Sequence, residues 1–220
     1  MVKMQAVTRI ILRKLLVKDH NNVTLERKIP DLADHFQGID EFGLYVHIPF
    51  CRQICPYCPY NKEVYHCEVA ERYATAVIRE VDLYSELFGM KPVTTFYIGG
   101  GTPTTMLHAG LDKILNHVYG TFNMQCEVHM ESHPNDLSQE NLKTIKSLGV
   151  AYLSIGVEAL QDHHLKTLSR PYTVEQVRAA ISRAVRAGFK MRQRGLHFCL
   201  AQPNLSGNRT GWSHARRNGS

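Results

Sequence analysis

Long hydrophobic runs are absent from this chain of 220 residues, because no stretch of eighteen consecutive apolar residues occurs in it. This absence excludes a membrane-spanning helix. The basic, partly apolar segment 7–17 lacks a small-residue cleavage site. We therefore interpret it as a docking helix or strand, with a targeting sequence as the alternative. With 44% hydrophobic and 21% charged residues, the composition is typical of a globular domain with one sizeable core.

Acidic residues are missing from the end of the chain. Five arginines and no Asp or Glu follow Met191, so that removing them from the net charge of +6 leaves only +1 for residues 1–190. A nearly neutral body argues against a nucleic-acid partner, which requires a basic surface. The same tail contains the single tryptophan, Trp212, and has no periodic apolar pattern.

Paired cysteines are also lacking. Three of the six cysteines are scattered and fit no disulfide framework: Cys67, Cys126 and Cys199. Unpaired thiols indicate a reducing compartment, and we expect the protein to be cytoplasmic. The other three form a C-x3-C-x2-C pattern: Cys51, Cys55 and Cys58.

Three thiols at this spacing can occupy three corners of an iron–sulfur cube, which normally takes four cysteines. One iron is then left open to bind a small molecule, which indicates a catalytic rather than a purely electron-transferring cluster. The alternative is a structural zinc site, for which His66 and Cys67 lie close enough in sequence to supply a fourth ligand. Against it, zinc ribbons usually pair two C-x2-C motifs, and the sequence has no second one.

Strand-like and helix-like segments alternate along the chain. Hydrophobic periodicity predicts strands at 44–48, 94–98, 126–131 and 151–157. It predicts helices that end before Gly89, Gly120, Gly149 and Gly188, the last opening with a Thr173-x-x-Gln176 capping box. Four such units predict an α/β fold with a parallel sheet and outer helices.

Candidate ligand-binding residues follow each predicted strand. The cysteine pattern follows the first strand, Gly99-Gly-Gly-Thr-Pro103 the second, Glu131 ends the third and Glu158 ends the fourth. In parallel barrels ligands collect at the carboxyl ends of the strands. The glycine run lacks the spacing of phosphate-binding and dinucleotide-binding loops, so we expect its bare backbone to approach a different ligand, with a tight turn as the alternative.

The cysteine loop directly after Tyr45-Val-His-Ile-Pro, with the glycine run after the next strand, resembles the radical S-adenosylmethionine (SAM) superfamily. Within it, both motifs are similar to those of the oxygen-independent coproporphyrinogen III oxidases and their heme-chaperone relatives. The resemblance covers residues 43–190. It implies a partial (β/α) barrel, a [4Fe-4S] cluster on the three cysteines, and SAM on the open iron.

The resemblance also implies a set of SAM contacts, although it assigns no catalytic residue. Two aromatic positions line the SAM site, the glycine run holds the methionyl group, and one arginine contacts the SAM carboxylate. Glu158 stands where the family usually has Gln. For several of these residues an ordinary capping or salt-bridge role is the alternative. The expected contacts are Tyr45, Tyr57, Gly100, Gly101, Thr102, Glu131, Glu158 and Arg170.

The family chemistry implied is one-electron reductive cleavage of SAM to a 5′-deoxyadenosyl radical. The expected partners are a tetrapyrrole, coproporphyrinogen III or heme, and a reducing electron donor such as flavodoxin or ferredoxin. The oxidases proper carry another cysteine two positions after the third ligand, whereas Pro59 and Tyr60 follow Cys58 here. This departure is closer to the heme-chaperone branch, so a chaperone without decarboxylase activity is the alternative.

Residues 1–42 are expected to form an amino-terminal extension and residues 191–220 an out-of-frame tail. Read one nucleotide later with permitted codons, residues 192–204 yield Val-Asn-Val-Asp-Phe-Ile-Phe-Ala-Leu-Pro-Asn-Gln-Thr, which is similar to how the family continues. The fold is therefore expected to lack its carboxyl-terminal part, and an inactive product is a third functional alternative. A genuine basic, disordered arm is the other interpretation of the tail.

Overall fold

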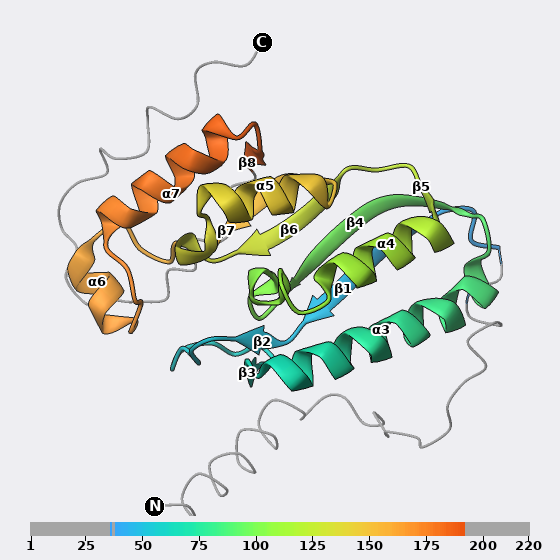
Figure 1. The fold of residues 1–220 in the computed structure, drawn as a ribbon, viewed down its shortest axis with the longest axis horizontal. Coiled ribbons are helices and arrows are strands. Elements are labelled where there is room, and N and C mark those ends of the chain that lie inside the picture. The colour runs from blue at the N-terminus through green and yellow to red at the C-terminus, as the bar shows by residue number, and fades with distance from the viewer. Residues whose placement is uncertain (1–35, 37, 192–220) are drawn as a thin grey trace, which may run out of the picture. The chain divides into compact units, whose positions relative to one another are not determined.

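A parallel β-sheet lies at the centre of residues 40–191 in the computed structural model, which describes residues 36 and 38–191 (Figure 1). Its strands run in the order β1-β4-β6-β7-β8, and the short strand β5, Asn123–Met124, pairs with β4. Every neighbouring pair is parallel. The main strands are β1 Phe42–Ile48, β4 Pro92–Gly100, β6 Val128–Ser132, β7 Val150–Ile155 and β8 Lys190–Met191.

Helices connect successive strands, as the sequence predicts for βα units, and Figure 1 shows α3 and α4 side by side along the sheet. The strand residues buried among them alternate with half-exposed ones, because successive side chains of a strand point to opposite faces. The helices are α3 Cys67–Phe88, α4 Leu111–Thr121, α5 Gln139–Ser147, α6 Asp162–Thr167 and α7 Val174–Arg186.

The structure confirms the predicted α/β class and differs from the predicted bounds in a few places. Helix α4 begins at Leu111 after Gly110, whose φ of 96° suits glycine, and it continues through Gly120 instead of ending before it. Strand β7 ends at Ile155, so Glu158 lies in the following loop. The short helix α6 was not predicted. The capping box of Thr173 and Gln176 is present at the start of α7.

Short elements close the loops at the carboxyl ends of the strands. Strand β2, Phe50–Cys51, pairs with β3, Glu63–Val64, and so joins the two ends of the cysteine loop. A 3-10 helix, η1 Pro103–Met106, follows the glycine run, and another, η2 Pro134–Asp136, follows β6. These elements place three loops beside one another at one end of the sheet.

Within residues 36 and 38–191, no helix has both the length and the apolar character needed to cross a bilayer. The predicted tail and most of the predicted amino-terminal extension lie outside the described residues.

Candidate functional site

One cavity of about 1090 Å³ opens at the carboxyl ends of the parallel strands. All eleven site residues predicted from the sequence line it, so the structure brings together positions spread over more than a hundred residues. They are Tyr45, Cys51, Cys55, Tyr57, Cys58, Gly100, Gly101, Thr102, Glu131, Glu158 and Arg170.

The three cysteines belong to one loop and are free thiols of intermediate exposure. Cys51 ends strand β2, and the backbone N–H of Cys58 donates to the carbonyl of Cys55 at 3.2 Å. The Thr102 hydroxyl donates to Cys51 Sγ at 3.5 Å. Burial raises the pKa of the Cys51 thiol, and the Thr102 hydrogen bond partly opposes that rise.

The donor set fits a cluster better than a single zinc ion. Among the described residues, no three His, Cys, Asp or Glu side chains are gathered around one point as a single ion requires. The ligands of a cube bind separate iron atoms and therefore stand further apart. His66 and Cys67 do not line the cavity, and the Cys67 thiol donates to Glu71 Oε1 at 3.7 Å instead. His47, by contrast, lines the cavity, and its buried Nε2 has no hydrogen-bond partner among the described residues.

The glycine run has a second reason for its glycines, besides the ligand approach that the sequence suggested. A Cβ on Gly101 would lie 2.7 Å from the Pro49 carbonyl oxygen and 2.8 Å from that of Phe50. A Cβ on Gly100, where φ is 118°, would lie 2.6 Å from the His47 ring. The bare backbone therefore lets the glycine loop approach the protein's own β1–β2 connection, and not only a ligand.

Glu131 is held in the cavity through both carboxylate oxygens. The Tyr97 hydroxyl donates to Oε1 at 2.8 Å, and the Gly100 backbone N–H donates to Oε2 at 3.1 Å. Burial raises the pKa of Tyr97, and its bond to Glu131 raises it further, so the phenol remains a donor at neutral pH. The sequence analysis did not predict Tyr97 as a site residue. Alignment of the two strands places Tyr97 opposite Tyr45, and this register could have indicated it.

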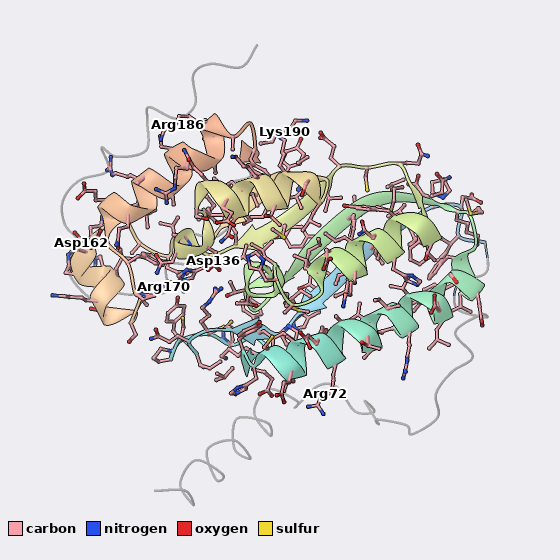
Figure 2. The ribbon with its side chains drawn as sticks, in the orientation of Figure 1. Arg72, Asp136, Asp162, Arg170, Arg186 and Lys190 are labelled. Atoms are coloured by element: carbon pink, nitrogen blue, oxygen red, sulfur yellow. The ribbon has the colours of Figure 1, made fainter. Side chains whose placement is uncertain are left out.

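Arg170 reaches the cavity from the loop after α6, and Figure 2 shows it at the same end of the sheet as Asp136. Its guanidinium donates to the Gly156 carbonyl at 2.7 Å, to the Tyr172 hydroxyl, and to Cys55 Sγ at 3.3 Å. Burial raises the pKa of Tyr172 to about 12. A half-buried cation is thus fixed beside a predicted cluster ligand.

Comparison with known proteins identifies the family. A family model described as the radical SAM superfamily matches residues 45–204. The chain belongs to the radical SAM superfamily. The match extends to residue 204 and so includes part of the predicted out-of-frame tail. Residues 192–220 lie outside the described residues, and the origin of the tail stays a prediction.

Individual relatives agree with this assignment. The heme chaperone HemW of Bacillus subtilis is 35% identical over 164 residues, which cover 73% of this chain and 43% of that protein. HemW of Lactococcus lactis is 32% identical over 148 residues, covering 66% and 38%. The solved structure of coproporphyrinogen III oxidase (HemN) from Escherichia coli, a radical SAM enzyme, is 25% identical with a TM-score of 0.69, covering 80% and 43%.

The chain therefore spans about two fifths of the length of the relatives that it matches. The parallel α/β fold is that of the radical SAM enzymes, as the sequence predicted. The [4Fe-4S] cluster and SAM are the cofactors of this superfamily, which confirms the predicted cofactors.

Several further residues that line the cavity escaped the sequence analysis. His47 and His133 line the cavity, and burial, with Arg170 nearby, lowers the pKa of His133 to about 4. Arg52 and Asp136 also line it and form an ion pair with each other. Asp136 is only two residues after Pro134 of the Glu-Ser-His-Pro motif. This closeness to Glu131 was the signal in the sequence that could have indicated Asp136 as a site residue.

Glu158, which the sequence analysis placed at a strand end, adopts a φ of 68° in the loop beyond β7. This left-handed conformation is uncommon for a residue with a Cβ. Ser169, directly before Arg170, has a φ of 54°. Glu158 and Ser169 therefore line the cavity in unusual backbone conformations. Such conformations are found preferentially at functional sites.

Proposed function

We propose that this chain holds a [4Fe-4S] cluster on Cys51, Cys55 and Cys58 and binds SAM beside it for reductive cleavage. The observation that carries the proposal is that all three thiols and all eight expected SAM contacts line a single cavity. When bound, the cluster supplies the electron that splits SAM into methionine and a 5′-deoxyadenosyl radical.

The charges in the cavity suit the amino-acid end of SAM, which carries an ammonium and a carboxylate. The N–H groups of the glycine run are already used, since Gly101 donates to the Ile48 carbonyl and Thr102 to that of Phe50. These N–H groups are therefore not free to bind the carboxylate of SAM. The ammonium group needs acceptors instead, and a charged one is Glu131, whose two oxygens are aimed by Tyr97 and Gly100. A carboxylate accepts up to about four hydrogen bonds, so Glu131 keeps capacity for a ligand.

Arg170 provides the complementary group. A guanidinium has five N–H donors, and three of its nitrogens donate to Tyr172, Cys55 and Gly156. Donors remain for a ligand carboxylate, which arginine binds with a well-defined geometry. One anion and one cation on the same cavity thus orient a zwitterion in a single direction.

The decisive test is anaerobic reconstitution of the full chain with iron and sulfide, followed by dithionite and SAM. Chromatography should show 5′-deoxyadenosine, and Cys55→Ala should abolish it because one cluster ligand is lost. Cys67→Ala is the matched control: that thiol is exposed and does not line the cavity, so the variant should match the wild type. A loaded wild-type chain that yields no 5′-deoxyadenosine contradicts the proposal.

A second candidate is a heme chaperone that keeps the cluster and SAM site but does not decarboxylate a porphyrinogen. It is favoured because both HemW relatives above are named heme chaperones, and because Pro59 and Tyr60 follow the third cysteine. Hemin titration, followed by the Soret absorbance, should then show saturable binding, while coproporphyrinogen III releases no carbon dioxide. Decarboxylation by the reconstituted chain favours the oxidase instead. A flavodoxin or ferredoxin is the proposed electron donor in either case.

A further inference from the structure

The segment that carries the three cysteines has little backbone support of its own. Between residues 52 and 62, the backbone hydrogen bond among the described residues is the one from Cys58 to Cys55. At the base of the loop, Glu63 donates to Pro49 and Tyr65 donates to Cys51. A loop with so few internal bonds adopts one conformation only if other parts of the protein hold it.

Arg52, the residue directly after Cys51, supplies such a connection. Its guanidinium pairs with Asp136 Oδ1 at 2.5 Å, although 58% of the Arg52 side chain is exposed against 7% of the Asp136 side chain. The two residues are 84 positions apart, and Asp136 ends η2 in the loop after β6 (Figure 2). The pair therefore ties the cysteine loop to the neighbouring βα loop.

Asp136 is itself held in place by groups from two other segments. The Thr104 hydroxyl, in η1 after the glycine run, donates to its second carboxylate oxygen, Oδ2, at 2.5 Å. The Asn141 side chain donates to its backbone carbonyl at 2.7 Å. A buried carboxylate requires charged or hydrogen-bonding partners, and this one has both oxygens occupied. It is a fixed point that joins the loops after β1, β4 and β6.

We propose that Asp136, acting through Arg52, is a positioning residue that holds the cysteine loop in the conformation that binds the cluster. The inference rests on the proposed function, since it concerns the same three thiols. Asp136 contacts none of them. It acts by keeping Cys51 beside the cavity. Gln53, which donates to the Ser169 carbonyl at 3.3 Å, and Arg170, which donates to Cys55 Sγ at 3.3 Å, provide further tethers.

The test compares Arg52→Gln with Arg72→Gln, which removes an equal charge from an exposed residue of α3 on the outside of the molecule (Figure 2). The rate at which a chelator removes iron from the reconstituted full chain is followed by the loss of cluster absorbance. We expect Arg52→Gln to lose iron about threefold to tenfold faster than wild type, a consequence of one lost charged hydrogen bond. Arg72→Gln should match wild type, and Arg52→Lys should restore part of the retention.

Three further measurements distinguish a positioning role from a general loss of stability. Glutamine at position 52 can still donate to the buried Asp136, whose Oδ2 keeps the Thr104 hydroxyl, so the melting temperature of Arg52→Gln should fall by no more than a few degrees. High salt should bring the wild-type iron-loss rate toward that of Arg52→Gln and leave the variant unchanged, because salt screens the pair. Asp136→Asn should cause no additional loss in the Arg52→Gln background, since both changes remove one interaction.

Hydrogen exchange of the cluster-free chain separates this inference from the proposed function. Arg52→Gln should increase exchange at residues 52–62 and leave residues 99–106 unchanged. If the wild-type chain takes up no cluster, the proposed function fails, and this exchange pattern still decides whether the tether exists. Equal exchange and equal iron loss in Arg52→Gln and wild type would overturn the tether while leaving the cluster proposal intact.

Discussion

The glycine loop and the cysteine loop border the same cavity but are built in opposite ways. The glycine loop is attached by its backbone, with Gly101 donating to Ile48 at 2.7 Å and Thr102 to Phe50 at 2.8 Å, and the residues of η1 that follow are buried. The cysteine loop is largely exposed and is attached to other segments by side-chain contacts, those of Arg52 and Gln53 and that of Arg170 with Cys55 Sγ. Lys62 donates to the Cys58 carbonyl within the loop itself.

The difference separates two tasks. Backbone bonds and buried packing give the glycine loop one conformation before any ligand arrives, which suits a surface that orients SAM. Side-chain contacts hold the cysteine loop while its backbone makes few hydrogen bonds, which suits thiols that, in the proposed function, close around a cluster assembled later. The following changes test this contrast, beginning with the largest expected effect.

Gly101→Ala should disrupt the rigid loop. The added Cβ would meet two backbone oxygens within 2.8 Å, and backbone atoms cannot move aside as a flexible side chain can. We expect a loss of about 3 kcal/mol in the free energy of unfolding, as for an overpacked core. Urea unfolding of the cluster-free chain measures it.

Gly120→Ala is the matched control, because the added Cβ in helix α4 would have no atom within 4 Å. Alanine in a helix interior should instead raise the free energy of unfolding by about 0.5–1 kcal/mol. Equal stability of the two variants would show that the close approach of the glycine loop to the β1–β2 connection is not real.

A smaller effect concerns the loop after β6, which carries Asp136. Burial lowers the pKa of His133 to about 4 from an ordinary value of 6.5, and its Nδ1 accepts a hydrogen bond from the Asn135 N–H, which favours the neutral ring. Between these two values the unfolded chain binds the proton and the folded chain does not. Stability is therefore fully present above pH 6.5 and should fall by on the order of 2 kcal/mol as the pH drops toward 4.

Urea unfolding at a series of pH values measures this dependence. His133→Gln should flatten the slope between pH 6.5 and 4, whereas His108→Gln, at an exposed histidine, supplies the comparison slope. If the His133 variant keeps the wild-type slope, the acid sensitivity has another source, and the loop that anchors Arg52 does not depend on a neutral His133.

Much of this arrangement was predictable from the sequence because periodicity determines elements and parallel strands place their carboxyl ends together. The strand preceding Cys51 and the one preceding Gly99 were found in this way, and so was the shared cavity. The partners of Arg52 and Glu131 were not, because a side-chain contact across 84 or 34 positions depends on strand register and loop packing. Local patterns carry no information on either. The same limit explains why the contact of the glycine run with the β1–β2 connection was not predicted.

Thr102→Val should produce the smallest effect, at a side-chain hydrogen bond that joins the two loops. The hydroxyl donates to Cys51 Sγ at 3.5 Å and lowers the pKa of a thiol that burial raises, so its loss should raise that pKa further. Because the thiolate is the nucleophile, alkylation of Cys51 in the cluster-free chain should slow by about twofold at neutral pH. Peptide mass spectrometry follows the modified residue, and Thr121→Val, whose hydroxyl instead bonds the His117 carbonyl in α4, is the control.

Valine keeps the shape of threonine, so the glycine loop should stay in place and the alkylation of Cys58 should not change. A slowing at all three cysteines would mean that the hydroxyl supports the whole cysteine loop, and the contrast between a rigid and an adjustable loop would then have to be abandoned.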